Sequence, residues 1–255
     1  AIIPDSQLGG SFTDNPGPCV SVNIYRVRQT ASNGIDVHES NSTDLVVGSV
    51  NGELPVTTHV DVDPATGLAE VFFDYTVTAE TLGYIIYKCS GAGSAEVLQI
   101  DNPNATSALI PTSLASSQPE SYRVSAFECI NDDGTPNPNA AGACTASIFT
   151  IATQLPCTYS AQISWNTPFG IEGGVDHYSV QVSIYDEALS NYGPWITLDD
   201  VASSVNNYLH EGDNTENTNK YRVLAESTSG NVAHSSEFEL DFLYPESANA
   251  PVLKR

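Results

Sequence analysis

The sequence predicts an all-β protein built from tandem β-sandwich domains. The tripeptide Tyr-Arg-Val starts at Tyr25, Tyr122 and Tyr221, and these copies hold three of the five arginines in the 255-residue chain. The copies lie 97 and 99 positions apart, which matches a sandwich domain of about 100 residues and is too long for a solenoid repeat. Short alternating runs separated by Gly, Pro, Asn and Asp fill the intervals, as is typical of all-β chains.

Residues 1–54 carry the first copy of the tripeptide but too few strands for a sandwich. Val20–Arg28 has the pattern of the next-to-last strand of a sandwich, and Asp36–Val47 has that of the last strand. The segment before Cys19 supplies none of the five earlier strands. We therefore expect the tail of a preceding sandwich, or an atypical extension, completed by the same polypeptide or by another chain.

Residues 55–153 are expected to form a complete sandwich. The alternation of apolar and polar residues in each run predicts one buried face per strand. The segment Asn131–Ala143 is rich in Asn, Pro, Gly and Asp and has no strand pattern, so we expect a long loop there. The predicted strands are His59–Val62, Ala69–Phe73, Gly83–Lys88, Val97–Ile100, Ala105–Ile110, Tyr122–Phe127 and Ser147–Ala152.

Residues 154–243 repeat this plan as a second sandwich, and residues 244–255 contain Pro245 and Pro251 and are typical of a linker. The first run of the second sandwich places Ala161, Ile163 and Trp165 on one face. Its predicted strands are Ser160–Trp165, His177–Tyr185, Trp195–Leu198, Ser204–Leu209, Lys220–Glu226 and His234–Phe242.

Composition narrows the possible partners and the cellular location. The chain has 31 acidic and 8 basic residues, a formal net charge of −23, and such a charge repels nucleic acid and anionic membrane surfaces. No run approaches the 18 apolar residues of a membrane span. Methionine is absent even at position 1, so we expect a processed chain or a segment of a longer one. Five cysteines without a CxxC pair favour an oxidising compartment and argue against zinc.

The chain resembles fibronectin type III domains in the runs Tyr122-Arg-Val-Ser-Ala and Tyr221-Arg-Val-Leu-Ala, in the Gly83-Tyr-Ile-Ile-Tyr run and in Trp165. The resemblance implies tandem immunoglobulin-like, fibronectin type III sandwiches. It also implies that Tyr122 and Tyr221 form tyrosine corners, with each hydroxyl bonded to nearby backbone, and that Trp165 packs in the core.

A narrower resemblance covers roughly residues 55–240. The stretches HVDVDPATG, GYIIYKC, YRVSAFEC, FTIATQLPC and AQISWNTPFG look like the modular surface proteins of Bacteroidetes that carry gliding-motility-type sorting domains and leave through the type IX secretion system. This resemblance implies a secreted protein on the bacterial cell surface, with other modules of one long polypeptide as its partners. The long Asn131–Ala143 segment departs from the pattern, and no sorting domain is present.

The disulfide pairing has two candidate solutions. Cys129 and Cys144 flank the long loop, at the end of one strand and the start of its antiparallel neighbour, so they could come within bridging range. The resemblance suggests Cys129 with Cys157 instead, which would tie one module to the next. Cys89 lies at the opposite end of its strand from Cys129, which disfavours that pair.

The sequence indicates no catalytic or cofactor motif. GxSxG, HExxH and P-loop patterns are all missing, so we expect a protein that is not an enzyme. Calcium is the metal ion that fits the sequence best, because it is bound by loop oxygens. Asp61 and Asp63, near the junction of the modules, are the first choice of ligands among several acidic clusters. Tyr185, Tyr192 and Trp195 bracket a Gly-Pro turn and could form a sugar-stacking platform, if their rings are exposed side by side.

These features together predict a non-enzymatic segment of a secreted, modular cell-surface protein that acts as an adhesive stalk or spacer. One alternative is a carbohydrate-binding accessory module of a secreted polysaccharide-degrading system. Another is a subunit of an extracellular filament or surface complex, in which residues 1–54 pair with another chain by β-augmentation.

Overall fold

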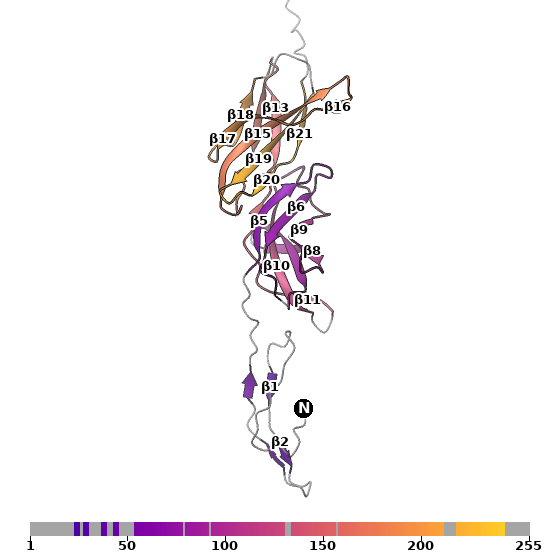
Figure 1. Cartoon of the computed structure of the whole chain (residues 1–255), viewed down its shortest axis with the longest axis vertical. Helices are drawn as coiled ribbons and strands as arrows, with labels where there is room; N and C mark the ends of the chain where they lie inside the picture. Colours follow the sequence, from indigo (N-terminus) through magenta and orange to yellow (C-terminus); the bar gives the residue numbers. More distant parts are fainter. Residues whose placement is uncertain are drawn as a thin grey trace, which may run out of the picture.

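The computed structural model describes residues 54–78, 80–91, 93–130, 134–156, 158–211 and 218–242, together with four short strands nearer the N-terminus. Every regular element in these residues is a β-strand, and all strand pairs are antiparallel (Figure 1). The described residues contain no helix that could cross a bilayer. The predicted all-β class is therefore confirmed.

The four N-terminal strands form two small ladders of one hairpin. Strand β1 (Asn23–Tyr25) pairs with β4 (Thr43–Leu45), and β2 (Arg28–Thr30) pairs with β3 (Val37–Glu39). The two strands predicted for this region thus pair with each other, and the remaining residues of 1–53 lie outside the described part of the chain.

The first sandwich, residues 55–146, packs a three-stranded sheet of order β5-β6-β9 against a sheet of order β8-β7-β10, in which β11 and β12 both pair with the far edge of β10. Its strands are β5 (Val56–Val62), β6 (Ala69–Asp74), β7 (Gly83–Ser90), β8 (Gly93–Ile100), β9 (Ser107–Leu109), β10 (Ser121–Ile130), β11 (Pro136–Pro138) and β12 (Thr145–Ala146).

The second sandwich, residues 150–242, has a three-stranded sheet of order β13-β14-β18. Its facing sheet is centred on β15 and β19, with β16 and β17 on one side and β20 and β21 on the other. Its strands are β13 (Thr150–Gln154), β14 (Ala161–Trp165), β15 (Val175–Asp186), β16 (Asn191–Tyr192), β17 (Ile196–Ala202), β18 (Asn207–His210), β19 (Thr218–Ser227), β20 (Val232–His234) and β21 (Phe238–Asp241).

The strand order of both sandwiches is that of a fibronectin type III domain. In chain order, the first, second and fifth main strands form one sheet, and the third, fourth, sixth and last strands form the other. In the letters used for this fold, β5 and β13 are A strands, β10 and β19 are F strands, and β12, β20 and β21 belong to G strands. The predicted tandem of immunoglobulin-like, fibronectin type III sandwiches is confirmed.

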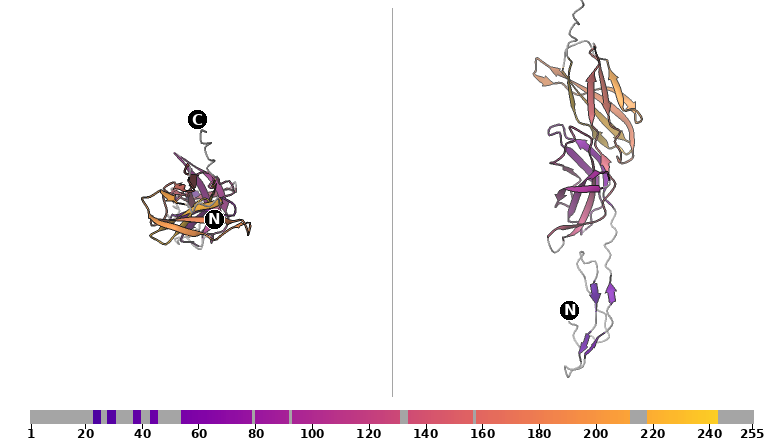
Figure 2. Two further views of the ribbon diagram at one scale, coloured as in Figure 1. Left: turned by 90° about the horizontal axis from the view of Figure 1, so that it is seen from above. Right: turned by 180° about the vertical axis from the view of Figure 1, so that it is seen from behind.

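Each sandwich has its own apolar core, made by alternate residues of its strands. In the first, Val60, Val71, Ile86 and Val124 are fully buried between the sheets. In the second, Trp165 packs edge-on against Tyr178, with ring centroids 5.4 Å apart. Trp165 therefore lies in the core as the sequence predicts. The two sandwiches lie one beyond the other along the long axis of the molecule (Figure 2).

One predicted boundary and one predicted loop differ from the structure. Ser147–Ala152 was expected to close the first sandwich, but β13 (Thr150–Gln154) pairs with β14 of the second sandwich, so the boundary lies at residues 147–149 and not at 153/154. No glycine or proline interrupts the segment from β12 to the end of β13, so the sequence carries no turn signal at this boundary. The predicted long loop also contains the short strand β11, which extends the sheet along β10.

The joint between the two sandwiches as the candidate functional site

The linker of residues 147–149 is short and fully engaged with both sandwiches. Its backbone makes five hydrogen bonds. Ser147 N–H donates to Glu120 O at 2.7 Å, Ser236 N–H donates to Ile148 O at 3.1 Å, and Asn166 N–H donates to Phe149 O at 3.4 Å. The Asn166 side chain makes the other two, since Nδ2 donates to Ser147 O at 3.0 Å and Oδ1 accepts from Phe149 N–H at 2.6 Å.

The linker is also anchored by apolar burial. Ile148 is fully buried in the core of the second sandwich, and the Ser147 hydroxyl accepts from Glu120 N–H at 3.0 Å in the first. Fully burying an isoleucine side chain contributes roughly 1.5–3 kcal/mol. A linker that is hydrogen-bonded and buried in this way has little freedom to bend, unlike the polar linkers that allow neighbouring domains to move.

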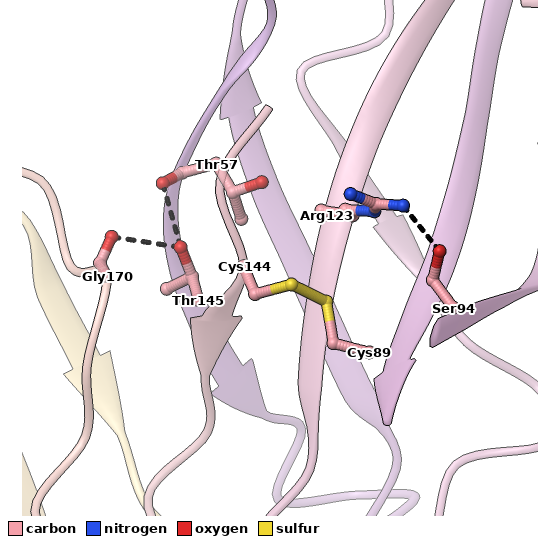
Figure 3. The surroundings of a disulfide bond; sticks show 7 residues. All are labelled: Thr57, Cys89, Ser94, Arg123, Cys144, Thr145 and Gly170. Carbon is pink, nitrogen blue, oxygen red and sulfur yellow. Dashed lines mark hydrogen bonds between the residues drawn. A yellow bond between two sulfur atoms is a disulfide. The ribbon is translucent and has the colours of Figure 1, made fainter. Parts of the chain in front are cut away.

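The edge strand β5 of the first sandwich is covered by the β14–β15 loop of the second. Glu172 N–H donates to Thr58 O at 2.9 Å, and Ala146 N–H donates to Phe169 O at 2.9 Å. The Thr145 hydroxyl lies 3.2 Å from Thr57 O and 2.9 Å from Gly170 O, and Figure 3 shows it between these two carbonyls. Backbone groups that would be open at a sheet edge are thus satisfied across the joint.

Glycine is required at position 170 by this close approach. Gly170 has a φ of +78°, and a Cβ atom there would lie 2.2 Å from Cys144 O and 2.9 Å from Thr145 Cα. Both atoms belong to the backbone of the first sandwich and cannot rotate away. Gly174, in the same loop, has a φ of +72° but no atom within 4 Å of its Cβ position. A side chain would strain the backbone at both positions, but only at Gly170 would it also collide with the first sandwich. Comparing substitutions at the two positions therefore distinguishes backbone strain from contact across the joint.

A forked hydrogen bond joins the sandwiches on the β5–β20 side. The Asp61 carboxylate accepts from His234 N–H at 2.8 Å, and its second oxygen lies 3.1 Å from His234 Nδ1. His59 stacks on Phe72 with ring centroids 4.4 Å apart, and its Nε2 lies 3.9 Å from the same carboxylate. Burial lowers the pKa of His59, although the neighbouring Asp61 charge opposes this. Asp61 therefore fixes the relative position of the two sandwiches.

Glu120 holds the first sandwich together directly beneath the linker. Its side chain is buried and forms an ion pair with Lys88. It also accepts hydrogen bonds from the Tyr122 hydroxyl at 2.6 Å, the Ser113 hydroxyl at 2.7 Å and Leu114 N–H at 3.0 Å. Burial opposes ionisation, but these hydrogen bonds outweigh it and lower the pKa of Glu120 to about 2. The sequence does not mark Glu120 as buried, because an isolated glutamate is normally a surface residue.

The tyrosine corners take a form that the family resemblance did not predict. Tyr122 and Tyr221 are fully buried, as expected, but their hydroxyls bond to side chains and not to backbone. Tyr122 donates to Glu120, and the Tyr221 hydroxyl lies 3.3 Å from Asn219 Nδ2 and 2.9 Å from His210 Nδ1. Burial raises the pKa of Tyr221 to about 12. In both cases a residue two positions before the tyrosine supplies a partner.

The disulfide joins Cys89 and Cys144, with a Cα–Cα distance of 6.4 Å. The predicted Cys129–Cys144 pair is wrong, and Cys129 is a buried free thiol. The chain after β10 folds back along this strand, so the register partner of Cys129 is Asn137 and not Cys144. At the other end of β10, Tyr122 pairs with Lys88 on one side and with Thr145 on the other. The residues that follow Lys88 and precede Thr145 are the two bonded cysteines. The disulfide therefore lies beside Thr145 at the joint (Figure 3). Cys157 lies outside the described residues.

The two aspartates predicted as calcium ligands are occupied by protein groups. Asp61 lies at the junction of the sandwiches, as expected, but it bonds His234. Asp63 accepts from Ala65 N–H, Thr66 N–H and the Thr66 hydroxyl, at 3.1, 2.7 and 2.7 Å, and so caps the β5–β6 turn. In the described part of the chain, no group of three or more His, Cys, Asp or Glu side chains is arranged to hold a metal.

The predicted sugar platform does not form a flat aromatic surface. The rings of Tyr185 and Tyr192 meet at 69°, with centroids 5.2 Å apart. A cation lies over each of two rings, since Lys220 Nζ lies 4.5 Å from the Tyr192 centroid and the Arg222 guanidinium lies 4.2 Å from that of Trp195. A sugar that stacked on these two ring faces would have to displace the cations.

The arginine of the repeated tripeptide has a structural role in both sandwiches. Arg222 stacks on Trp195 and donates to Gln181 at 2.8 Å. Arg123 lies 5.8 Å from the Tyr87 ring centroid and donates to Ser94 at 2.5 Å. Both arginines lie on the outer face of the F strand, next to the inward tyrosine. The tripeptide thus combines a core residue, a surface residue that crosslinks strands, and a second core residue.

Comparison with known proteins supports no statement beyond the fold. No protein-family model matches the chain, and no curated protein matches it. Among solved structures, the FN1–FN3 domains of chicken CNTN1 match over 84% of this chain and 75% of that one, with 12% identity and a TM-score of 0.29. Domains from titin match over 86% and 74%, with 12% identity and a TM-score of 0.30. The assignment to fibronectin type III sandwiches rests on the strand order.

Proposed function

We propose that this chain is a non-enzymatic spacer segment of a modular extracellular protein, in which the joint keeps two sandwiches in one fixed relative position. The observation that carries this proposal is the linker of residues 147–149, whose backbone and side chains are bonded to both sandwiches. A joint without free linker residues transmits force and orientation from one end of the pair to the other.

The disulfide supports a location outside the cytoplasm, because bonds such as Cys89–Cys144 form and persist mainly in oxidising compartments. The net charge of −23 disfavours self-association and contact with anionic surfaces. A role as an adhesive stalk on a bacterial cell surface, with export through the type IX system, is part of this proposal and is supported by the sequence resemblance alone.

The described histidines support a structural role over a catalytic one. His59 stacks on Phe72, His210 packs edge-on against Tyr221, His234 bonds Asp61, and His177 lies 3.1 Å from Asp176 and 3.6 Å from Glu226. None of these pairs includes a serine or cysteine nucleophile of the kind that acyl transfer requires.

Replacing Gly170 with alanine is expected to open the joint without unfolding either sandwich. The new Cβ would overlap the backbone of the first sandwich at Cys144 O, so the β14–β15 loop must move away. The amides of Glu172, Ala146 and His234, whose acceptors lie across the joint, should then lose hydrogen-exchange protection by at least about tenfold, equivalent to ~1.4 kcal/mol.

Gly174→Ala is the matched control, because it carries the same backbone strain but meets no atom of the first sandwich. In this control variant, the amides of Glu172, Ala146 and His234 should keep the hydrogen-exchange protection that they have in the unmodified chain. Equal loss of protection in both variants would show that strain in the loop, and not contact across the joint, is responsible. Unprotected joint amides in the unmodified chain would refute the proposed rigid spacer.

A further inference from the structure

The N-terminal hairpin repeats the pairing of the last hairpin in the second sandwich, residue for residue. In the second sandwich, Tyr221 pairs with Phe238, two residues intervene, and Leu224 then pairs with His234. In the N-terminal hairpin, Tyr25 pairs with Thr43, two residues intervene, and Arg28 then pairs with Glu39. On the opposite strand, three residues separate the two ladders in both hairpins.

The sequences agree at some of the positions that this register brings together. Asn23-Ile-Tyr-Arg-Val and Asn219-Lys-Tyr-Arg-Val differ only at their second residue, whereas the partners of the two tyrosines differ, Thr43 in one hairpin and Phe238 in the other. The partner of Asn23 is Leu45, and the partner of Asn219 is Leu240. In the second sandwich, this asparagine supplies one of the hydrogen-bond partners of the tyrosine hydroxyl. The N-terminal hairpin therefore has the register and spacing of an F–G hairpin, and part of its sequence.

What differs is the other edge of the F strand. In the second sandwich, β19 pairs on its second side with β15, the C strand, over nine register positions. In the described residues, β1 and β2 pair only with β4 and β3. Within the described residues, the edge that faces a C strand in the complete sandwich therefore has no partner strand, and an unpaired strand edge is a site for strand addition.

We propose that strands β1–β4 are the F–G hairpin of a third sandwich, and that the unpaired edge of β1 and β2 binds a C strand of the same polypeptide. Chain order favours a source N-terminal to β1, because strands A to E precede F in this fold. In the second sandwich these strands span residues 150–210. This inference does not depend on the rigidity of the joint, since it concerns a different end of the chain.

A fusion protein tests this proposal with a donor of known sequence. Residues 150–218, which carry strands A to E of the second sandwich, replace residues 1–22 and are joined directly to Asn23 of the otherwise complete chain. We expect a third cooperative unfolding transition. We also expect hydrogen-exchange protection at the amides of β1 and β2 to rise at least about 100-fold over the unfused chain.

Two variants and one control complete the test. Gln29 stands at the register position of the fully buried Ala225, so a second fusion carries Gln29→Ala. A third fusion has one alanine inserted between Tyr25 and Arg26, which exchanges the faces of the following residues and should abolish the protection. A complete copy, residues 150–242, placed ahead of Asn23 calibrates the third transition. The proposal is overturned if this copy gives the transition while neither hairpin fusion gains protection.

Discussion

Glu120→Gln is expected to lower the free energy of unfolding of the first sandwich by about 3 kcal/mol at neutral pH. The carboxylate is buried, its pKa is lowered from 4.5 to about 2, and it accepts hydrogen bonds from Lys88, Tyr122, Ser113 and Leu114 N–H. Glutamine has nearly the same size but carries no charge, and its amide group places a donor against other donors. Chemical denaturation, followed by hydrogen exchange in each sandwich, measures the loss.

The same residue predicts how stability depends on pH. Because the folded state lowers the pKa of Glu120, the fold favours the ionised carboxylate. This contribution is complete above pH 4.5 and is lost as the pH falls toward 2. Glu120→Gln should remove this part of the acid dependence from the first sandwich. Glu96→Gln on the exposed part of β8 is the control and should change stability by no more than about 0.5 kcal/mol. An unchanged acid transition in Glu120→Gln would contradict this role.

Removing the disulfide with the double replacement Cys89→Ser and Cys144→Ser is expected to destabilise the first sandwich by about 2–4 kcal/mol. The bond closes a segment with a sequence separation of 55, and without it the unfolded chain gains the entropy of that open loop. The second sandwich has no cysteine in this bond and should keep its own unfolding free energy. Thermal unfolding with and without reductant measures both effects.

Peptide mapping under non-reducing conditions provides the control for this prediction. Cys89 and Cys144 should be recovered in one linked peptide, with Cys129 free. Cys129→Ala leaves the bond intact and should cost less than the double replacement. A linked Cys129–Cys144 peptide, or equal stability with and without the bond, would contradict the structure at this point.

The sequence predicted correctly those features that depend on the pattern within a single strand. Alternation within each run located the inward residues of β10 and β19, and the spacing of the tripeptide placed Tyr122 and Tyr221 on equivalent strands. Trp165 was placed correctly in a core because its neighbours alternate in the same way. These features depend on local periodicity, which a single segment of sequence contains.

The joint could not be predicted because its contacts are long-range. Glu120 is recognisable as buried only when Lys88 and Ser113 are known to lie beside it. The disulfide depends on how far residues 134–144 fold back along β10, which composition does not reveal. The Asn166 side chain reaches the backbone of Ser147 and Phe149 only because a loop of the second sandwich folds against residues 147–149. The sequence marked Asp61 as a junction residue, but as a metal ligand and not as the acceptor for His234.

Residual dipolar couplings of backbone amides in a weakly aligned sample test the central claim most directly. If the joint fixes the two sandwiches, couplings from residues 55–146 and from residues 150–242 will fit one alignment tensor, with one orientation and one magnitude. Two tensors of different magnitude would show that the sandwiches reorient independently, and the rigid spacer would then be wrong.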